Sequence, residues 1–412
     1  MGTATFVKRT PVTEQATTRR RPQNGDLLLA AATVALCLFG LLILYSASTD
    51  YAFRVYHNAY YIFNKQVLWV ALGATSAFLC ARMDYHRWRQ LVLPAMALTI
   101  GLLVVVLFVN ETRHGAARSI LGGSVQPSEL AKLVLVLYLA VWLDGRQEHL
   151  HDVQLGLLPL AAILGLIGGL IYLQPDLSAT ATIFVLGALL FFLAGGELRQ
   201  IVMFMVVALL VGWVVVQFSV TGRTRLADYL AGLHDPLQSS YHVKRALEAI
   251  IKGGWFGVGI GRGTTKLTGL PWPFTDSIFA VLVEEQGFFG ALVLMGLYGI
   301  LLWRGIHIAQ RAPDMLGMVM AGGLTFWIII EALINISVMI GLLPFAGNTL
   351  PFISAGGSNL VASLTAIGIL LGISRQAGQA VTGVETERRL YGATVDLRRR
   401  DRRRRFARSR RA

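Results

Sequence analysis

Repeated long apolar stretches constrain the fold of this chain more than any other feature. The first runs from Leu27 to Tyr45. Further stretches lie near residues 62–82, 88–109, 127–143, 154–173, 178–195, 198–219, 276–303, 314–343 and 357–374. A helix of about 20 apolar residues crosses the hydrocarbon core of a bilayer and satisfies its own backbone hydrogen bonds. The chain is therefore predicted to be an all-α polytopic membrane protein with about ten transmembrane helices.

Little sequence remains outside these stretches. Of the 412 residues, 55% are hydrophobic and only 15% are charged, so the chain is more apolar than a soluble protein of this size. Because no long mixed polar stretch is left over, no large water-soluble domain is expected. Both cysteines, Cys37 and Cys80, lie inside apolar stretches, which argues against a disulfide or a zinc site.

Basic tails flank the membrane domain, which is predicted to cover residues 26–375. The N-tail is residues 1–25 and the arginine-rich C-tail is residues 376–412. An even number of spans places both tails on one side, and the arginines of alternate loops fall there too, which predicts cytoplasmic termini. A cleaved signal peptide is the alternative for the first stretch, but its length favours a retained span. The C-tail is expected to bind anionic lipids rather than nucleic acid.

A long outer loop, residues 221–275, is predicted between spans seven and eight, and a loop of this length usually has a function. Its segment Ser239–Lys252 is expected to form an amphipathic helix on the bilayer, followed by a glycine-rich turn over Gly253–Gly263. Cations on the outer side serve no purpose in orientation, so they suggest a polyanionic, lipid-anchored ligand, with ordinary anionic headgroups as the alternative. The candidates are Arg113, Arg118, Arg223, Arg225, Lys244, Arg245 and Arg262.

An acidic residue, Asp276, stands where a long apolar helix begins, after the proline-containing segment Pro271–Thr275. This places a carboxylate at the membrane boundary, near the positive end of a helix dipole, where it can act as a base. The alternative is a simple helix cap. A broken, re-entrant segment over Gly341–Ser358 is expected to line a cavity beside Asp276, because irregular backbone at membrane depth is tolerated only there.

Other ionisable residues lie at or within the spans. Glu129 and Lys132 are one helical turn apart and are predicted to form an ion pair, which is either functional or structural. Glu284 and Glu285 lie too far along their helix to pair with Asp276, so a partner is expected in Lys132 or in an arginine of a neighbouring span.

The ordered motifs of the chain resemble the SEDS family (shape, elongation, division and sporulation), whose best-known members are bacterial FtsW and RodA. The resemblance covers nearly the whole membrane domain, and the tails and motif wording lean toward the FtsW type. The motifs are Tyr45–Ser48, Gln126–Lys132, Gln174–Leu177, Gly253–Gly257, Thr275–Gly287 and Leu350–Ser358.

The resemblance implies an inverting peptidoglycan glycosyltransferase that polymerises lipid II at the outer face of the bacterial cytoplasmic membrane, in cell division or elongation. It also implies a class B penicillin-binding protein as partner, together with divisome or elongasome proteins. The catalytic aspartate of the family matches Asp276, and Glu129, Lys132 and Asp176 match other family positions. Trp272–Phe274 departs from the Glu-Ala-His that is common in the family, and His242 replaces a frequent glutamine.

Glycan polymerisation needs a base for the attacking hydroxyl and cations for the departing diphosphate. Asp276 suits the first role; the outer cations suit the second, and Asp176, Ser354 and Ser358 are further substrate-binding candidates. No cofactor is required by the sequence, although a divalent Mg²⁺ or Mn²⁺ is possible. Two alternatives stand beside this function: a flippase or transporter of lipid-linked precursors, and a catalytically weakened divisome scaffold.

Overall fold

The computed structural model describes residues 26–108 and 126–378, and helices dominate both ranges. Four short helical turns are η1 (Tyr85–Arg87), η2 (Gln147–His149), η3 (Val153–Leu157) and η4 (Pro236–Gln238). The longer helices, in chain order, are α1 (Leu27–Tyr56), α2 (Tyr61–Arg82), α3 (Trp88–Phe108), α4 (Pro127–Asp144), α5 (Leu158–Tyr172), α6 (Leu177–Leu193), α7 (Leu198–Phe218), α8 (Val220–His234), α9 (Tyr241–Gly253), α10 (Ile278–Arg311), α11 (Met315–Met339) and a last, unlabelled helix over Gly357–Gly378.

Eight of the helices in the described ranges are long and apolar enough to cross a membrane, so the chain is a multi-pass membrane protein. Helix α6 is apolar but has only 17 residues. Helix α4 has 18 residues and carries three charged side chains, Glu129, Lys132 and Asp144. Both helices coincide with predicted spans, but α6 is too short and α4 carries too many charges to be included among the eight. The count of ten spans therefore stays a prediction.

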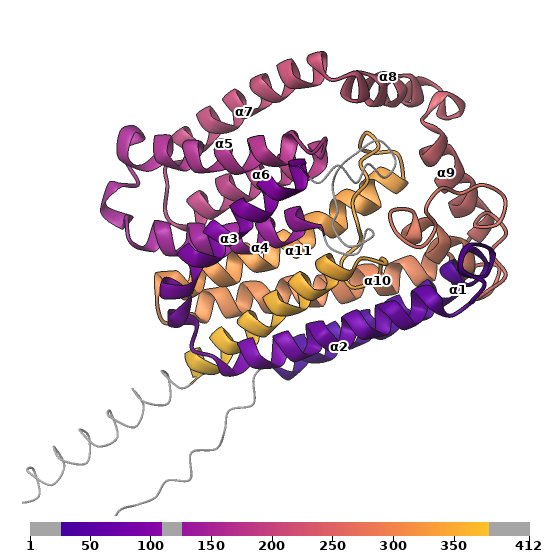
Figure 1. Cartoon of the computed structure of the whole chain (residues 1–412), viewed down its shortest axis with the longest axis horizontal. Coiled ribbons are helices and arrows are strands. Elements are labelled where there is room, and N and C mark those ends of the chain that lie inside the picture. Colours follow the sequence, from indigo (N-terminus) through magenta and orange to yellow (C-terminus); the bar gives the residue numbers. More distant parts are fainter. Residues whose placement is uncertain (1–25, 109–125, 379–412) are drawn as a thin grey trace, which may run out of the picture.

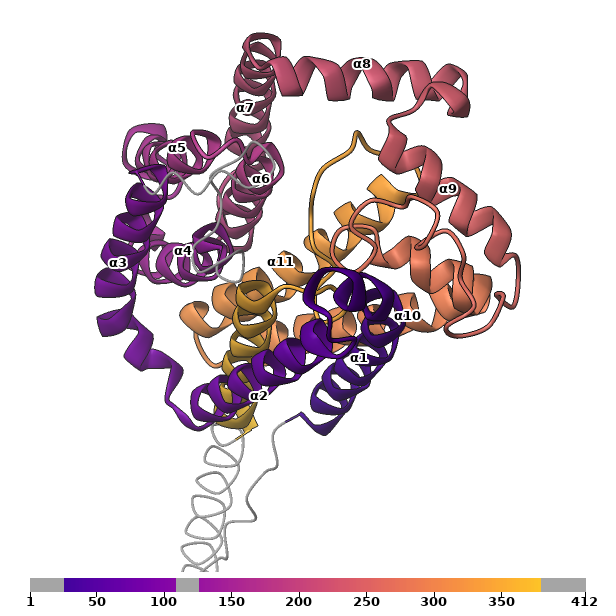
Figure 2. The same ribbon diagram turned by 45° about the vertical axis from the view of Figure 1, so that its right-hand side comes forward.

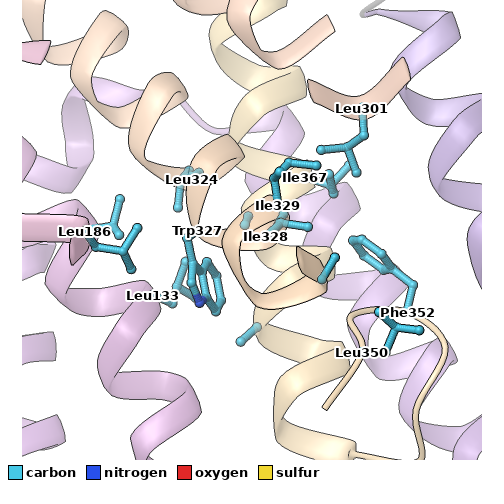
Figure 3. Packing of buried hydrophobic residues seen from close by; sticks show 14 of the residues in the cluster. Leu133, Leu186, Leu301, Leu324, Trp327, Ile328, Ile329, Leu350, Phe352 and Ile367 are labelled. Atoms are coloured by element: carbon cyan, nitrogen blue, oxygen red, sulfur yellow. The ribbon is translucent and has the colours of Figure 1, made fainter. Parts of the chain in front are cut away.

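Helices α10 and α11 form the centre of the bundle. Helix α1 packs on α10, and α4 and α6 pack on α11 (Figure 1). Figure 3 shows part of this core: Trp327 of α11 lies near Leu133, and Phe352 lies farther away, beyond Ile328 and Ile329. By contrast, α7 lies at the margin and buries only Gln200 and Phe204. Figure 2 shows α8 continuing from α7 along the edge of the bundle before α9 returns to α10.

Helix α9 confirms a predicted helix, whereas its predicted place on the bilayer stays a prediction. Residues Ser239–Lys252 were expected to form an amphipathic helix on the bilayer, and the helix is present as Tyr241–Gly253. Its apolar face, however, packs against α10, where Ala246 and Ala249 are completely buried. The small side chains allow this close approach between helices, so part of the apolar stripe covers protein, whereas Ile251 is 79% exposed.

The glycine-rich segment Gly254–Gly263, called the strap below, lies against a break in α10. Gly287 has φ 69° and ψ −167°, which interrupts the helix. The strap takes up hydrogen bonds there: Phe288 N donates to Gly254 O at 2.9 Å, and Val258 N donates to Glu284 O at 3.0 Å. A Cβ at Gly257 would stand only 2.2 Å from Glu285 O, so only glycine permits this approach.

Candidate functional site

Asp276 lies two residues before α10, at the end of the segment Pro271–Thr275, and is half-buried. The N-cap position of α10 is Ser277, so Asp276 is not the capping residue. Its Oδ2 faces the irregular segment between α11 and the last helix, because a Cβ at Gly347 would stand 3.0 Å from that oxygen. A glycine at this position therefore leaves room beside the carboxylate.

Three successive backbone carbonyls hold the Asp276 segment in place. Phe274 O accepts a hydrogen bond from Ala355 N at 2.8 Å, and Thr275 O accepts one from Ser354 Oγ at 2.7 Å. Asp276 O accepts one from Nδ2 of Asn335 at 2.9 Å. Since the donors come from α11 and the irregular segment, the backbone that carries the carboxylate is fixed from two sides.

Asn335 links these two elements. It is 1% exposed on α11, and its Nδ2 also donates to Asn348 O at 2.6 Å. Sequence reasoning missed it, although a polar amide within an apolar span is the signal that would have found it.

Several buried polar atoms around Asp276 have no hydrogen-bond partner in the described part of the chain. They are Ser277 Oγ, Asn335 Oδ1, Asn348 Nδ2 and Thr349 Oγ1. Buried polar atoms are normally hydrogen-bonded, so a cluster of such atoms suits a place where water or a ligand supplies the missing partners.

The predicted cations divide into two groups. Arg245 contacts Glu248 and donates to Thr268 O, so its guanidinium braces the loop below α9. Arg225 lies 5.5 Å from the ring centroid of Phe345 in the irregular segment. No ion pair within the described ranges engages the remaining described candidates, Arg223, Lys244 and Arg262. Arg113 and Arg118 lie outside the described residues.

Three predicted substrate-binding side chains make structural contacts. Asp176 is 4% exposed and caps α6 by accepting from Ala179 N at 3.1 Å. Ser354 is also 4% exposed, and its Oγ accepts a hydrogen bond from Leu350 N. Ser358 Oγ accepts from Gln126 N at 3.0 Å, at the start of α4. These bonds give all three side chains a structural role, and a substrate contact by any of them stays a prediction.

The buried pair on α4 is part of a larger network. Lys132 Nζ lies 2.9 Å from Glu129 Oε1 and also contacts Glu331 of α11. Asn359 Nδ2 donates to both carboxylates, at 2.7 Å and 3.0 Å. Sequence reasoning proposed the pair but not Glu331, which lies 199 positions away. The network joins α4, α11 and the last helix.

Among residues 26–108 and 126–378, Glu284 and Glu285 pair with neither Lys132 nor an arginine, which corrects the prediction. Glu284 accepts hydrogen bonds from Thr265 N at 3.0 Å and from Thr265 Oγ1 at 2.9 Å. Glu285 Oε1 lies 2.7 Å from Lys266 Nζ, which is itself bound to Ser46 of α1. Both carboxylates therefore anchor the loop that follows the strap, because that loop brings donors directly over α10.

Side chains suited to a metal ion do not gather in residues 26–108 and 126–378. No group of three or more His, Cys, Asp or Glu side chains occurs in those ranges. The participation of a divalent cation stays a proposal, and no catalytic step is assigned to one.

A cavity of about 370 Å³ lies near the site, on the side of α1. Its walls come from the end of α1 and from residues 266–274. The cavity expected next to Gly341–Ser358 stays a prediction.

Comparison with known proteins gives consistent matches. The family model FtsW/RodA/SpoVE, described as "Cell cycle protein", matches residues 27–379. Stage V sporulation protein E of Bacillus subtilis (strain 168) is 37% identical over 357 residues, which cover 85% of this chain and 97% of that protein. A probable peptidoglycan glycosyltransferase FtsW of Trichlorobacter lovleyi is 36% identical over 353 residues, covering 85% of this chain and 93% of that protein.

Solved structures share the architecture. One, titled "Structural coordination of polymerization and crosslinking by a peptidoglycan synthase complex", matches with a TM-score of 0.71 and 29% identity over 86% of this chain and 99% of that one. The rod shape determining protein RodA of Thermus thermophilus matches with a TM-score of 0.63 and 27% identity, covering 86% and 98% of the two chains. With the family model matching nearly the whole membrane domain, this chain belongs to the FtsW/RodA/SpoVE family.

Proposed function

We propose that this chain is an inverting peptidoglycan glycosyltransferase that polymerises lipid II into glycan strands. The observation that carries the proposal is the clamped backbone of Asp276, which holds a half-buried carboxylate among unpartnered polar atoms. The curated relatives named peptidoglycan glycosyltransferase FtsW support the reaction class. The same names give no support to a precursor transporter.

In the proposed reaction, a hydroxyl of one lipid-linked sugar attacks the anomeric carbon of another. The new carbon–oxygen bond forms as the bond to the diphosphate breaks, and the diphosphate leaves with the electron pair. Asp276 accepts the proton of the attacking hydroxyl. Arg223, Arg225, Lys244 and Arg262 are described cations proposed to stabilise the departing diphosphate. A Mg²⁺ or Mn²⁺ ion, if one takes part, would be carried by the diphosphate itself.

The setting proposed for this reaction is the outer face of the bacterial cytoplasmic membrane, with both termini in the cytoplasm. A class B penicillin-binding protein is the proposed partner within the divisome or elongasome, and the similarity to a peptidoglycan synthase complex supports it. Anionic lipids are the proposed partner of the basic C-tail. A cysteine at Lys244 should react with a membrane-impermeant reagent added outside; labelling only from the cytoplasmic side would reverse the orientation.

Polymerisation of labelled lipid II by the purified chain with its partner tests the proposal. The expected product is a ladder of glycan strands that a muramidase digests. A parallel assay in sealed vesicles measures movement of lipid II between leaflets. Movement without polymer would replace the proposed function by transport, and neither activity would favour a scaffold.

A further inference from the structure

The cavity beside α1 has features of a small-molecule site. Its volume of about 370 Å³ falls in the range of about 300–1,000 Å³ that is usual for such sites. The residues that line it are Ala47, Asp50, Tyr51, Arg54, Lys266, Leu267, Gly269, Leu270, Pro271, Trp272, Pro273 and Phe274. The wall is thus mainly aromatic and apolar, with a few charged groups at its rim.

The depth of the cavity follows from the length of α1. The helix has 30 residues, which corresponds to about 45 Å, whereas the hydrocarbon core is about 30 Å thick. Its apolar stretch ends at Tyr45, so the turns that carry Asp50 and Arg54 project beyond the hydrocarbon. Both of these side chains are exposed. The cavity therefore lies at the level of the headgroups and water rather than among acyl chains.

Three aromatic rings form one wall. The ring centroids of Tyr51 and Phe274 are 4.9 Å apart, and Trp272 meets Phe274 edge-on at 6.3 Å. Trp272 has φ 49°, a left-handed conformation that is costly for a bulky side chain. Such strain persists where the surroundings require it and is concentrated at functional positions. The strained backbone thus presents an indole to the cavity.

The charges select among ligand classes. Asp50 and Arg54 are one helical turn apart on α1, and the ammonium of Lys266 is already paired with Glu285. A carboxylate at the rim repels a diphosphate, and charged groups exclude an acyl chain. A sugar suits the aromatic wall, the carboxylate and the guanidinium together. Its C–H face packs on aromatic rings, while its hydroxyl and amide groups bond to Asp50 and Arg54.

We propose that this cavity is a saccharide subsite that binds an N-acetylated sugar of the glycan strand next to the reacting unit. Phe274 lines the cavity and is two residues from Asp276, so their Cα atoms are separated by at most about 7 Å. A sugar held on Trp272 would therefore lie next to the short segment that carries Asp276. This inference rests on the proposed polymerase function.

Binding is tested first with a soluble probe, the β-1,4-linked tetramer of N-acetylglucosamine, added to the full-length protein in detergent. Trp272→Ala should weaken binding about tenfold, which corresponds to about 1.4 kcal/mol. Trp303→Ala, which removes an indole that is 58% exposed at the other end of α10, should bind as the parent does. Asp276→Asn should also retain binding. Absence of probe binding by the parent, or equal binding by Trp272→Ala, would overturn the subsite.

A second variant tests the subsite in case Trp272→Ala fails to fold. Arg54→Ala removes an exposed side chain, so it should weaken binding of the probe and leave the thermal midpoint unchanged. In lipid II polymerisation, Arg54→Ala and Trp272→Ala should raise KM more than they lower kcat and should shorten the strands. Parent-like KM and strand length in both variants would reject the subsite while leaving the polymerase function intact.

Failure of the parent to polymerise lipid II would instead reject that function. If the two variants no longer associated with the partner protein while their probe binding stayed unchanged, the cavity would be assigned to the partner and the proposal would be overturned.

Discussion

Lys132 is 1% exposed and faces two carboxylates, those of Glu129 and Glu331. Removing the lysine alone leaves like charges together without a cation, at a cost of about 3–5 kcal/mol. We therefore expect Lys132→Met to be the least stable variant of a series. The double variant Glu129→Gln/Lys132→Met should recover part of the loss, and adding Glu331→Gln should recover more. Thermal unfolding of the purified variants measures this order; equal midpoints for all three would contradict the charge network.

His242 connects α9 to the irregular segment beside Asp276. Its ring stacks on Phe345 with centroids 4.2 Å apart, and its Nδ1 is buried without a partner among the described residues. Burial lowers the pKa of His242 below the usual 6.5, and the charge of Arg225 lowers it further. The neutral ring is therefore favoured in the folded protein.

The pH dependence follows from this direction. Below about pH 6.5 the unfolded chain takes up a proton at this histidine more readily than the folded protein does. The contribution of His242 to stability is therefore present above that pH and is lost as the pH falls toward the folded pKa. We expect the thermal midpoint to fall between about pH 7.5 and 5.5, and to fall less in His242→Gln. Equal pH profiles for the two proteins would show that His242 is not responsible.

At the scale of elements, the strap and the break in α10 form one unit. A Cβ at Gly287 would stand 2.4 Å from Gly257 N, and the φ of 69° is itself unfavourable for alanine. We expect Gly287→Ala to destabilise the protein by more than about 2 kcal/mol. The matched control is Gly296→Ala on the same helix, where a Cβ meets nothing within 4 Å. Because alanine favours a helix, the control should be at least as stable as the parent. Similar losses in both variants would refute the close packing of the strap.

Sequence patterns predicted helices well where one apolar period decided the structure. The stretches 62–82 and 198–219 became α2 and α7 almost unchanged. The helix at Ser239–Lys252 was predicted too, but its packing on α10 was not, because an apolar stripe does not show which partner covers it. Contacts between distant segments were beyond reach: nothing local in the sequence pairs Lys266 with Glu285 or Asn335 with Asp276.

At the scale of the whole molecule, α1, α10, α11 and the irregular segment meet around one short stretch, Pro271–Asp276. Asn335 and Ser354 bond its carbonyls on one side, and the cavity opens on the other. The sequence located the acidic residue at a helix start, but the alternative of a cap could be addressed only once Ser277 was seen at the N-cap. The helices therefore form a rigid framework, and the connection that contains Asp276 carries the residue proposed for the chemistry.

The central claim is that Asp276 is the general base of glycan polymerisation, and one variant tests it most directly. Asp276→Asn keeps the size of the side chain and removes its proton affinity, while the backbone clamp by Asn335 is unaffected. Polymerisation of lipid II, normalised to folded protein recovered with its partner, should fall about 10²–10⁴-fold, with the thermal midpoint preserved. Activity within about twofold of the parent would contradict the account and return Asp276 to a structural role.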